Sequence, residues 1–201
     1  MDKQAWRRHL RERRASIPAA RREAWAAQMV EHFFALPEIA KDSSQAVLLY
    51  AAVGAEVPTK PLAERLLREG FRVCLPRLFR DRPGFMEAAP VARWDELAPG
   101  PFFDIPQPPA DAPAVAPEAL DAVVVPAVGF DRRGRRLGQG GGYYDRFFAA
   151  LSRDVFRIGW AFSVQVVDEL PEEEHDQRVD VIVTEAGVLR PARRGTGGLG
   201  T

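Results

Sequence analysis

A cluster of four glycines is the part of this sequence whose residue types most directly suggest chemistry. The four are Gly138, Gly140, Gly141 and Gly142. Because glycine has no Cβ atom, backbone N–H groups in such a segment can approach an anion closely, and the positive end of a following helix adds to the attraction. Four arginines lie just before the cluster: Arg132, Arg133, Arg135 and Arg136. The segment therefore predicts a phosphate-binding loop.

The residues on either side of the glycines predict a strand and a helix. The β-branched run from Val123 to Val125 ends at Pro126, and the aromatic residues after the loop fall on one helical face. The glycine spacing does not fit the dinucleotide-binding pattern, and the Lys-Ser/Thr ending of a P-loop is missing. A plain flexible loop is therefore an open alternative, although a linker would not normally lie between a valine strand and an aromatic helix.

Two other segments carry charged side chains that could act together with the loop. Lys3 and Arg7 are four positions apart, so a helix would place both on one face, where they could bind the same anion. Taken alone, they fit a solvated basic helix better. Glu56 follows an apolar run at the place where open α/β sheets bind ligands, beyond the carboxyl end of a strand. A surface glutamate in a helix first turn is the alternative for Glu56.

The alternation of apolar runs with helical patterns predicts a single three-layer α/β/α domain with a largely parallel, Rossmann-like sheet over residues 1–190. Helices are expected over about residues 2–15, 18–36 and 58–70, the second with Ser16 as its N-cap. Strands are expected over residues 46–50, 71–79, 84–89, 123–126, 156–162 and 179–183. Residues 164–171 predict a short helix or turn, and the tail 191–201 is expected to be disordered.

The proline-dense region 94–117 predicts an irregular crossover or flap rather than a linker between domains. It contains Phe102, Phe103 and Ile105, for which a linker would have little use. The FFDIPQP portion is therefore expected to form part of a pocket wall.

Composition limits the classes of partner. Lys+Arg and Asp+Glu both number 28 in 201 residues, so the balance gives no reason to expect nucleic acid or an anionic membrane as partner. Cys74 is the single cysteine, which excludes an internal disulfide, and its apolar run predicts a buried, inert thiol. No apolar run approaches the roughly 18 residues of a membrane span. The Arg-rich start lacks the apolar core of a secretory signal, and Asp2 and Glu12 argue against a mitochondrial presequence, so a cytoplasmic location is expected.

The stretch VPAVGFDRRGRRLGQGGGYYDRF resembles the signature of the 5-formyltetrahydrofolate cyclo-ligase family. Further ordered matches extend over about residues 3–185: the Lys3 and Arg7 pair, YAAVGAEVPT with Glu56, FRVCLPRL, FFDIPQP and LPEEEHDQRVDVIVTE. The resemblance implies an ATP- and Mg²⁺-dependent enzyme that converts 5-formyltetrahydrofolate to 5,10-methenyltetrahydrofolate and releases ADP and phosphate. The implied route is phosphorylation of the formyl oxygen, followed by attack of N10. A homologue acting on another substrate and a non-catalytic folate- or nucleotide-binding protein are the alternatives.

The resemblance also implies roles for individual residues. Arg136 and Tyr143 are implied to be catalytic, and Asp145 and Asp176 to hold Mg²⁺. The implied ATP ligands are Lys3, Arg7, Arg136, Gly138, Gln139, Gly140, Gly141, Gly142, Tyr143 and Tyr144. The implied folate ligands are Glu56, Gln139, Gly140, Gly141, Gly142 and Tyr143, with Glu56 on the pterin's amide-and-amine edge. Gln139 departs from the aromatic or basic residue that family members often carry there. The protein is expected to be a monomer with no nucleic-acid or membrane partner.

Overall fold

A computed structural model of the chain describes residues 1–39, 45–102, 104–151, 154–171 and 177–191. The strands of its large sheet are β1 Ala46–Leu48, β2 Arg72–Leu78, β3 Met86–Pro90, β6 Ala122–Pro126, β9 Phe156–Trp160, β11 Val181–Thr184 and β12 Gly187–Leu189. Two small sheets contain β7 Gly129–Asp131, β8 Arg136–Leu137 and β10 Val166–Val167, and β4 Ala98–Pro99 and β5 Pro106–Gln107. The α-helices are α1 Lys3–Ala15, α2 Ala19–Phe34, α3 Lys60–Arg68 and α4 Tyr143–Ala149. Short 3₁₀ helices are η1 Trp94–Glu96, η2 Pro117–Ala119 and η3 Ser163–Gln165.

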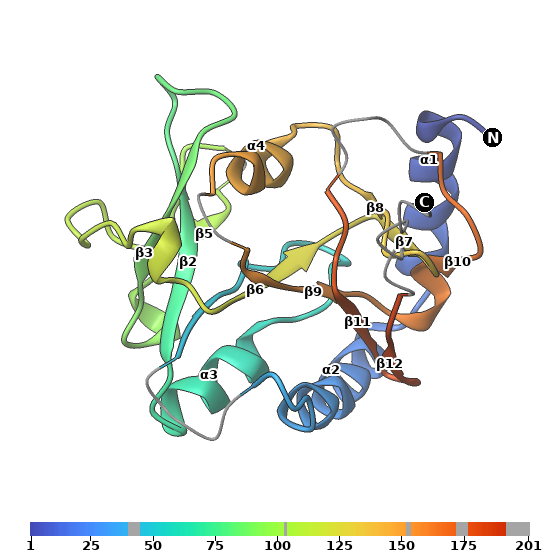
Figure 1. Ribbon diagram of the computed structural model, residues 1–201, viewed down its shortest axis with the longest axis horizontal. Coiled ribbons are helices and arrows are strands. Elements are labelled where there is room, and N and C mark those ends of the chain that lie inside the picture. The colour runs from blue at the N-terminus through green and yellow to red at the C-terminus, as the bar shows by residue number, and fades with distance from the viewer. Residues whose placement is uncertain (40–44, 103, 152–153, 172–176, 192–201) are drawn as a thin grey trace, which may run out of the picture.

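The large sheet has the strand order β12-β11-β9-β6-β1-β2-β3. Its five inner strands run parallel, and each edge strand, β3 and β12, pairs antiparallel with its neighbour. Helices α2 and α3 lie on one face of this sheet and α4 lies on the other (Figure 1). The prediction of a three-layer α/β/α fold with a largely parallel sheet is therefore confirmed.

The inner strands β1, β2, β6 and β11 each contribute to two hydrophobic cores, one on each face of the sheet, whereas β9 contributes to one. In β1, Val47 packs into the core that includes α2 and α3, whereas Leu48 packs into the core that includes Phe147 of α4. Successive side chains of a strand point to opposite faces, so both must be apolar when both faces are covered. This explains why the strands appear in the sequence as continuous apolar runs rather than alternating ones.

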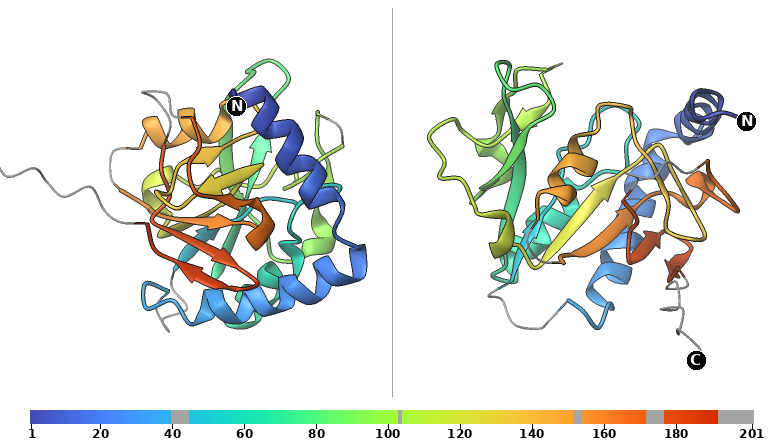
Figure 2. Two further views of the ribbon diagram at one scale, coloured as in Figure 1. Left: turned by 90° about the vertical axis from the view of Figure 1, so that its right-hand side faces the viewer. Right: turned by 45° about the horizontal axis from the view of Figure 1, so that its top comes forward.

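Helix α1 lies apart from these two cores, against the small sheet of β7, β8 and β10 (Figures 1 and 2). Its Leu10 is fully buried in a third cluster with Val128, Leu137 and Leu170. A Cβ atom on Gly129 would come within 2.4 Å of Leu10 Cδ1 and 2.9 Å of the Gln165 carbonyl oxygen. Glycine at position 129 is therefore needed for α1 to pack this closely.

One local prediction was wrong and another was only partly right, because neighbouring elements decide the outcome. Ser16 does not cap the second helix: it ends α1, where its N–H donates to the Glu12 carbonyl and its Oγ donates to the Arg13 carbonyl at 2.8 Å. Residues 164–171 form part of η3 and then the short strand β10, because Val166 pairs with Phe130 of β7. Both β7 and β8 fall between Pro126 and the glycine loop, where no strand was predicted.

The proline-rich segment crosses the edge of the sheet and is held there by Arg77. Arg77 is 8% exposed, and its Nη1 donates to the carbonyl oxygens of Pro109, Ala110 and Ala112 at 2.8, 3.0 and 2.8 Å. Its Nε donates to Glu87 Oε1 at 2.9 Å. One buried guanidinium thus satisfies three carbonyls of the irregular stretch between β5 and η2, which fits the predicted crossover.

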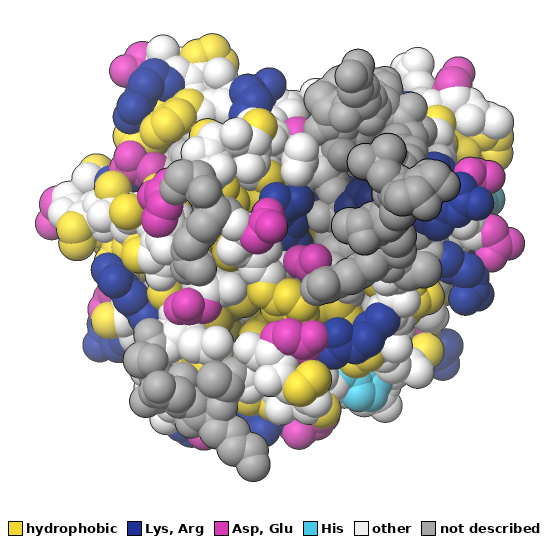
Figure 3. All heavy atoms as spheres, in the orientation of Figure 1, with side chains coloured by type: hydrophobic (Ala, Val, Ile, Leu, Met, Phe, Trp, Pro, Cys, Tyr) yellow, Lys and Arg dark blue, Asp and Glu magenta, His cyan; other side chains and the backbone are white. Residues whose placement is uncertain are grey.

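The distribution of charged side chains on the surface agrees with the equal numbers of basic and acidic residues in the sequence. On the face shown in Figure 3, Lys and Arg side chains are interspersed with Asp and Glu side chains. Across the described ranges, the helices are all too short or too polar to span a membrane.

The structure predicts that Cys74 is unreactive until the protein unfolds. Its side chain is fully buried in β2, and burial raises the pKa of the thiol to about 11. At pH 8 the native thiol therefore stays protonated, and the thiolate is the reactive form. Reaction with a disulfide reagent at pH 8 should be at least about 100-fold slower in the native protein than in urea, where the pKa returns to its ordinary range. Equal rates in the two conditions would contradict the burial.

Candidate active site

The candidate site lies at the centre of the large sheet, where the chain leaves two neighbouring strands toward opposite edges of the sheet. Strands β1 and β6 are parallel neighbours at the centre, with Val47 opposite Ala122. Strand β1 leads through α3 to β2 on one side, and β6 leads through α4 to β9 on the other. Since α3 and α4 cover opposite faces, a crevice opens beyond the carboxyl ends of β1 and β6, which is where open α/β sheets bind ligands.

A cavity of about 600 Å³ occupies this crevice. It brings together every predicted site residue except one: Lys3, Arg7, Glu56, Arg136, Gly138, Gln139, Gly140, Gly141, Gly142, Tyr143, Tyr144 and Asp145. The exception is Asp176, which, with His175, lies outside the described residues. Residues separated by more than a hundred positions therefore share one cavity.

The glycine loop is closed at its two ends by an ion pair. Arg136 is in β8, before the loop, and Asp145 is in α4, after it; Arg136 Nη2 lies 2.8 Å from both carboxylate oxygens. The Arg136 side chain is 6% exposed and that of Asp145 is 22% exposed. Gly140 and Gly142 have φ angles of 107° and 65°, which only glycine adopts readily. The loop is thus a short turn between β8 and α4 that this ion pair closes.

Helix α1 carries a row of three arginines beside the cavity, of which Arg7 lines its wall. Arg7 Nε donates to the Gly138 carbonyl at 2.9 Å, Arg11 Nε donates to Gln139 Oε1 at 3.1 Å, and Arg14 Nη1 donates to the Ala127 carbonyl at 3.4 Å. Positions 7, 11 and 14 lie on one helical face. This face fixes the start of the glycine loop against α1, so the N-terminal helix is part of the site rather than a solvated appendage.

Glu56 lies on the opposite side of the loop, between β1 and α3. Its Oε2 accepts from the Val53 N–H at 3.1 Å, and its Oε1 accepts from Gln139 Nε2 at 3.4 Å. Behind it, the Tyr50 hydroxyl donates to the Val57 carbonyl at 2.9 Å. Burial, reinforced by Glu56 and opposed by Arg14, raises the pKa of Tyr50 well above its ordinary value. Tyr50 is therefore a neutral neighbour of the Glu56 carboxylate at physiological pH.

Tyr144 is a second tyrosine in the cavity wall, and it is partly buried. Burial raises the pKa of Tyr144 although Arg136 opposes the rise. Its hydroxyl is buried and has no hydrogen-bond partner among the described residues. A protonated donor in this position is available to a polar group that enters the cavity.

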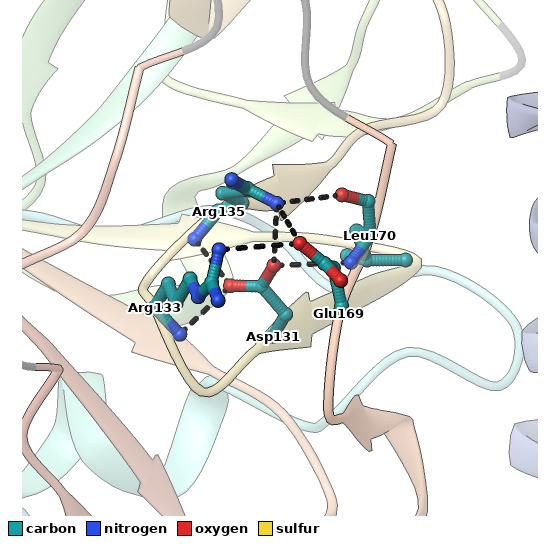
Figure 4. Close-up of polar contacts among 5 residues, drawn as sticks. All are labelled: Asp131, Arg133, Arg135, Glu169 and Leu170. Carbon is teal, nitrogen blue, oxygen red and sulfur yellow. Dashed lines mark hydrogen bonds and ion pairs between the residues drawn. The ribbon is translucent and has the colours of Figure 1, made fainter.

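The hairpin between β7 and β8 places Arg136, and a buried carboxylate holds that hairpin. Asp131 is fully buried, and its Oδ1 accepts from the N–H groups of Arg133 and Arg135 at 2.9 and 3.0 Å. Its Oδ2 accepts from the Leu170 N–H at 3.0 Å (Figure 4). Glu169 accepts from Arg133 Nη1 and Arg135 Nη1, each at 3.2 Å. These contacts connect the hairpin to the chain after β10.

These contacts correct the predicted phosphate cradle, because only one of its four arginines lines the cavity. Arg132 pairs with Asp168 at 3.0 Å, and Arg133 and Arg135 pair with Glu169. Of these four arginines, Arg136 alone lines the cavity. The two acidic residues come from a loop more than thirty positions away, so the sequence near the glycines could not reveal this division.

The remaining wall of the cavity is apolar. It includes Phe102, Ile105 and Pro106 from the proline-rich segment, as the sequence predicted for FFDIPQP, together with Leu78 and Met86 from β2 and β3.

Arg11, Arg14 and Tyr50 were not predicted as site residues. The two arginines could have been found by extending the helical spacing from Lys3 and Arg7, whereas Tyr50 carried only the signal of a buried strand end.

The carboxylates of the site fit a phosphate-bound Mg²⁺ rather than a protein-only metal cage. Within the described ranges, no three His, Cys, Asp or Glu residues are grouped as metal ligands. Mg²⁺ is commonly bound by one or two carboxylates together with phosphate oxygens and water. Asp145 lines the cavity, and a carboxylate has lone pairs left when it accepts from one arginine.

Comparison with known proteins gives a consistent result over most of the chain. Residues 1–185 match the model of the 5-formyltetrahydrofolate cyclo-ligase family. The chain is 32% identical over 181 residues to the 5-formyltetrahydrofolate cyclo-ligase of Escherichia coli K12, covering 89% of this chain and 98% of that protein. It is also 32% identical over 180 residues to the Mycolicibacterium smegmatis 5-formyltetrahydrofolate cyclo-ligase, covering 87% and 89%.

Solved structures show the same similarity. The NMR structure of Aquifex aeolicus 5,10-methenyltetrahydrofolate synthetase has a TM-score of 0.81 at 30% identity, with all of both chains covered. A Mycoplasma pneumoniae 5,10-methenyltetrahydrofolate synthetase shares the fold, with a TM-score of 0.73 at 23% identity over 92% of this chain and 99% of that one.

The structure predicts that Asp131→Asn destabilises the protein without touching the cavity. An amide cannot accept as the carboxylate does from three N–H groups, and it loses the charge that faces Arg135 Nη1 at 3.7 Å. The free energy of unfolding in urea should fall by about 2–4 kcal/mol. Asp168→Asn is the matched control, because Asp168 is 94% exposed and its pair with Arg132 contributes little. Similar losses in both variants would contradict the role of the buried carboxylate.

Proposed function

Because the chain belongs to the 5-formyltetrahydrofolate cyclo-ligase family, we propose that it cyclises 5-formyltetrahydrofolate to 5,10-methenyltetrahydrofolate at the expense of ATP. The products are then the methenyl compound, ADP and phosphate. The observation that carries this proposal is a single cavity with arginines and a glycine loop on one side, a carboxylate on another and an apolar wall between. We further propose that residues 1–190 act as one domain, as a cytoplasmic monomer.

The cationic side of the cavity suits the triphosphate. We assign Lys3, Arg7 and Arg136, with the glycine loop from Gly138 to Tyr144, to ATP. A guanidinium has five N–H donors, so Arg136 can bind a phosphate oxygen while it stays paired with Asp145. Loop N–H groups that face an anion add to this attraction.

The opposite side suits the folate. Glu56 can accept hydrogen bonds from the amide-and-amine edge of a pterin, and the apolar wall that includes Phe102 and Ile105 can cover flat rings. Residues 139–143 lie between the two sides and would contact both substrates.

The chemistry requires that the formyl oxygen be held in line with the γ-phosphate. A formamide oxygen is a poor leaving group, so its phosphorylation comes first; N10 then attacks the formyl carbon, and phosphate leaves as the ring closes. We assign Arg136 to stabilising the charge of the transferring phosphoryl group and Tyr143 to orienting the substrate beside it. Mg²⁺, when bound, would neutralise phosphate charge, and we assign its binding to Asp145 and Asp176.

The proposal predicts an ATP-dependent change in ultraviolet absorbance when purified protein is mixed with 5-formyltetrahydrofolate and Mg-ATP. The methenyl product has its own absorption band, so its appearance reports turnover directly. Omission of ATP should abolish the signal. Asp145→Asn, which keeps one oxygen acceptor for Arg136, should lower turnover by at least about 100-fold, and it should also lower the melting temperature because the buried Arg136 guanidinium loses its counter-charge. Absence of any ATP-dependent product from the wild-type protein would overturn the proposed function.

Glu56→Gln is expected to weaken folate binding selectively. The variant keeps the shape of the side chain and its acceptor for the Val53 N–H, but it loses the charge that would bind the pterin edge. Since a hydrogen bond to a charged group is worth about 1.5–3 kcal/mol, KM for 5-formyltetrahydrofolate should rise about 10- to 100-fold. KM for ATP should stay within about threefold of the wild-type value. A parallel rise in both constants would show that Glu56 does not separate the two substrates.

A further inference from the structure

We propose that Arg11 and Gln139 are positioning residues that orient the Glu56 carboxylate and thereby set the affinity for the folate. This inference rests on the proposed function, because it concerns the substrate assigned to Glu56. Neither residue needs to touch the reacting atoms. Arg11 acts through the hydrogen bonds that lead to Glu56, and Gln139 has this role in addition to the substrate contacts proposed for residues 139–143.

The three side chains form one continuous chain of hydrogen bonds. Arg11 donates through Nε and Nη2 to Gln139 Oε1, with the Nε contact at 3.1 Å. Gln139 Nε2 then donates to Glu56 Oε1 at 3.4 Å. The other Glu56 oxygen accepts from the Val53 N–H, so both carboxylate oxygens have a defined donor. The carboxylate is therefore held from two directions.

The two charged ends fix the direction of the Gln139 amide. A guanidinium is only a donor and a carboxylate is only an acceptor, so the amide oxygen must face Arg11 and the amide nitrogen must face Glu56. The reverse orientation would lose both contacts. An acidic side chain at position 139 would repel Glu56, and a basic one would repel Arg11. This hydrogen-bond chain therefore requires, at position 139, a neutral side chain that can both donate and accept.

These contacts join three elements that the sequence keeps far apart. Arg11 is in α1, Gln139 is in the glycine loop and Glu56 is in the connection after β1, with separations of 128 and 83 positions. The loop side of the cavity is assigned to ATP, and Glu56 is assigned to the folate. The Gln139 amide therefore lies at the junction of the two sides.

The location of this hydrogen-bond chain makes it possible to distinguish a positioning role from a role in stabilising the fold. Arg11 and Gln139 are both exposed, and the buried contacts of α1 are made by Leu10 and Arg14. Removing the outer hydrogen bonds should therefore leave the fold intact but allow Glu56 to reorient. A change in folate affinity without a change in stability is the expected signature.

A double-mutant cycle on the full-length protein tests this inference by equilibrium titration with 5-formyltetrahydrofolate. Arg11→Ala and Gln139→Ala should each raise Kd by about fivefold, and the double variant should be no worse than the poorer single variant, because both break one chain. Arg11→Lys should recover part of the loss. Gln139→Glu should be more harmful than Gln139→Ala, because it places a second carboxylate beside Glu56. Thermal melts should be unchanged in Arg11→Ala.

Arg8→Ala is the matched control, since Arg8 is an exposed arginine of the same helix that does not line the cavity. It should leave Kd unchanged, and its effect should simply add to that of Gln139→Ala. If Arg11→Ala behaves like Arg8→Ala, the inference is overturned while the proposed function stands. If the wild-type protein binds the folate but makes no product, the proposed function fails. The Kd values of the double-mutant cycle then still show whether Arg11 and Gln139 position Glu56. If the wild-type protein does not bind the folate, both are overturned.

Discussion

The ion pair between Arg136 and Asp145 is the interaction on which the arrangement of the site depends. It joins the last strand before the glycine loop to the first turn of the helix after it. Removing either partner would leave a charge in a largely buried position, which is strongly unfavourable. The loop is therefore a closed ring of backbone whose two ends cannot separate without breaking this pair.

Two more arginines hold the carbonyl groups of the ring from outside. Arg7 donates to the Gly138 carbonyl, and Arg146 donates to the Gly141 carbonyl as well as to the Gly84 carbonyl of the β2–β3 connection at 3.0 Å. The loop is thus tied to α1 on one side and to the edge of the large sheet on the other. Such preorganisation lets a phosphate bind without first ordering a flexible glycine segment.

The position of this closed loop depends in turn on the buried carboxylate of Asp131, which lies outside the cavity. Asp131 shapes the hairpin that carries Arg136, and its contact with the Leu170 N–H ties that hairpin to the chain beyond β10. The same region receives Leu10 of α1, so the helix that supplies Arg7 and Arg11 is placed by the small sheet. The large sheet creates the crevice, but this small sheet aligns the charged groups within it.

The sequence by itself determined what depends on neighbouring residues. Continuous apolar runs separated by helical patterns predicted the largely parallel sheet and its helices, and the glycines between Val125 and Phe147 predicted a loop that leads into a helix. The spacing of Lys3 and Arg7 placed both on one helical face. Resemblance to a family then connected these segments with Glu56 and Asp145, which local pattern alone left ambiguous.

Only the tertiary structure decided which charged groups face the cavity. Arg133 and Arg135 look equivalent to Arg136 in the sequence, yet they pair with Glu169, over thirty positions away. The contacts of Arg7 with Gly138 and of Gln139 with Glu56 span 131 and 83 positions. A hydrogen bond depends on distance in space, and the chain reveals such a distance only when the sheet and helices have brought its ends together. The pairing of charges, and with it the proposed division of the site between two substrates, is therefore a property of the fold.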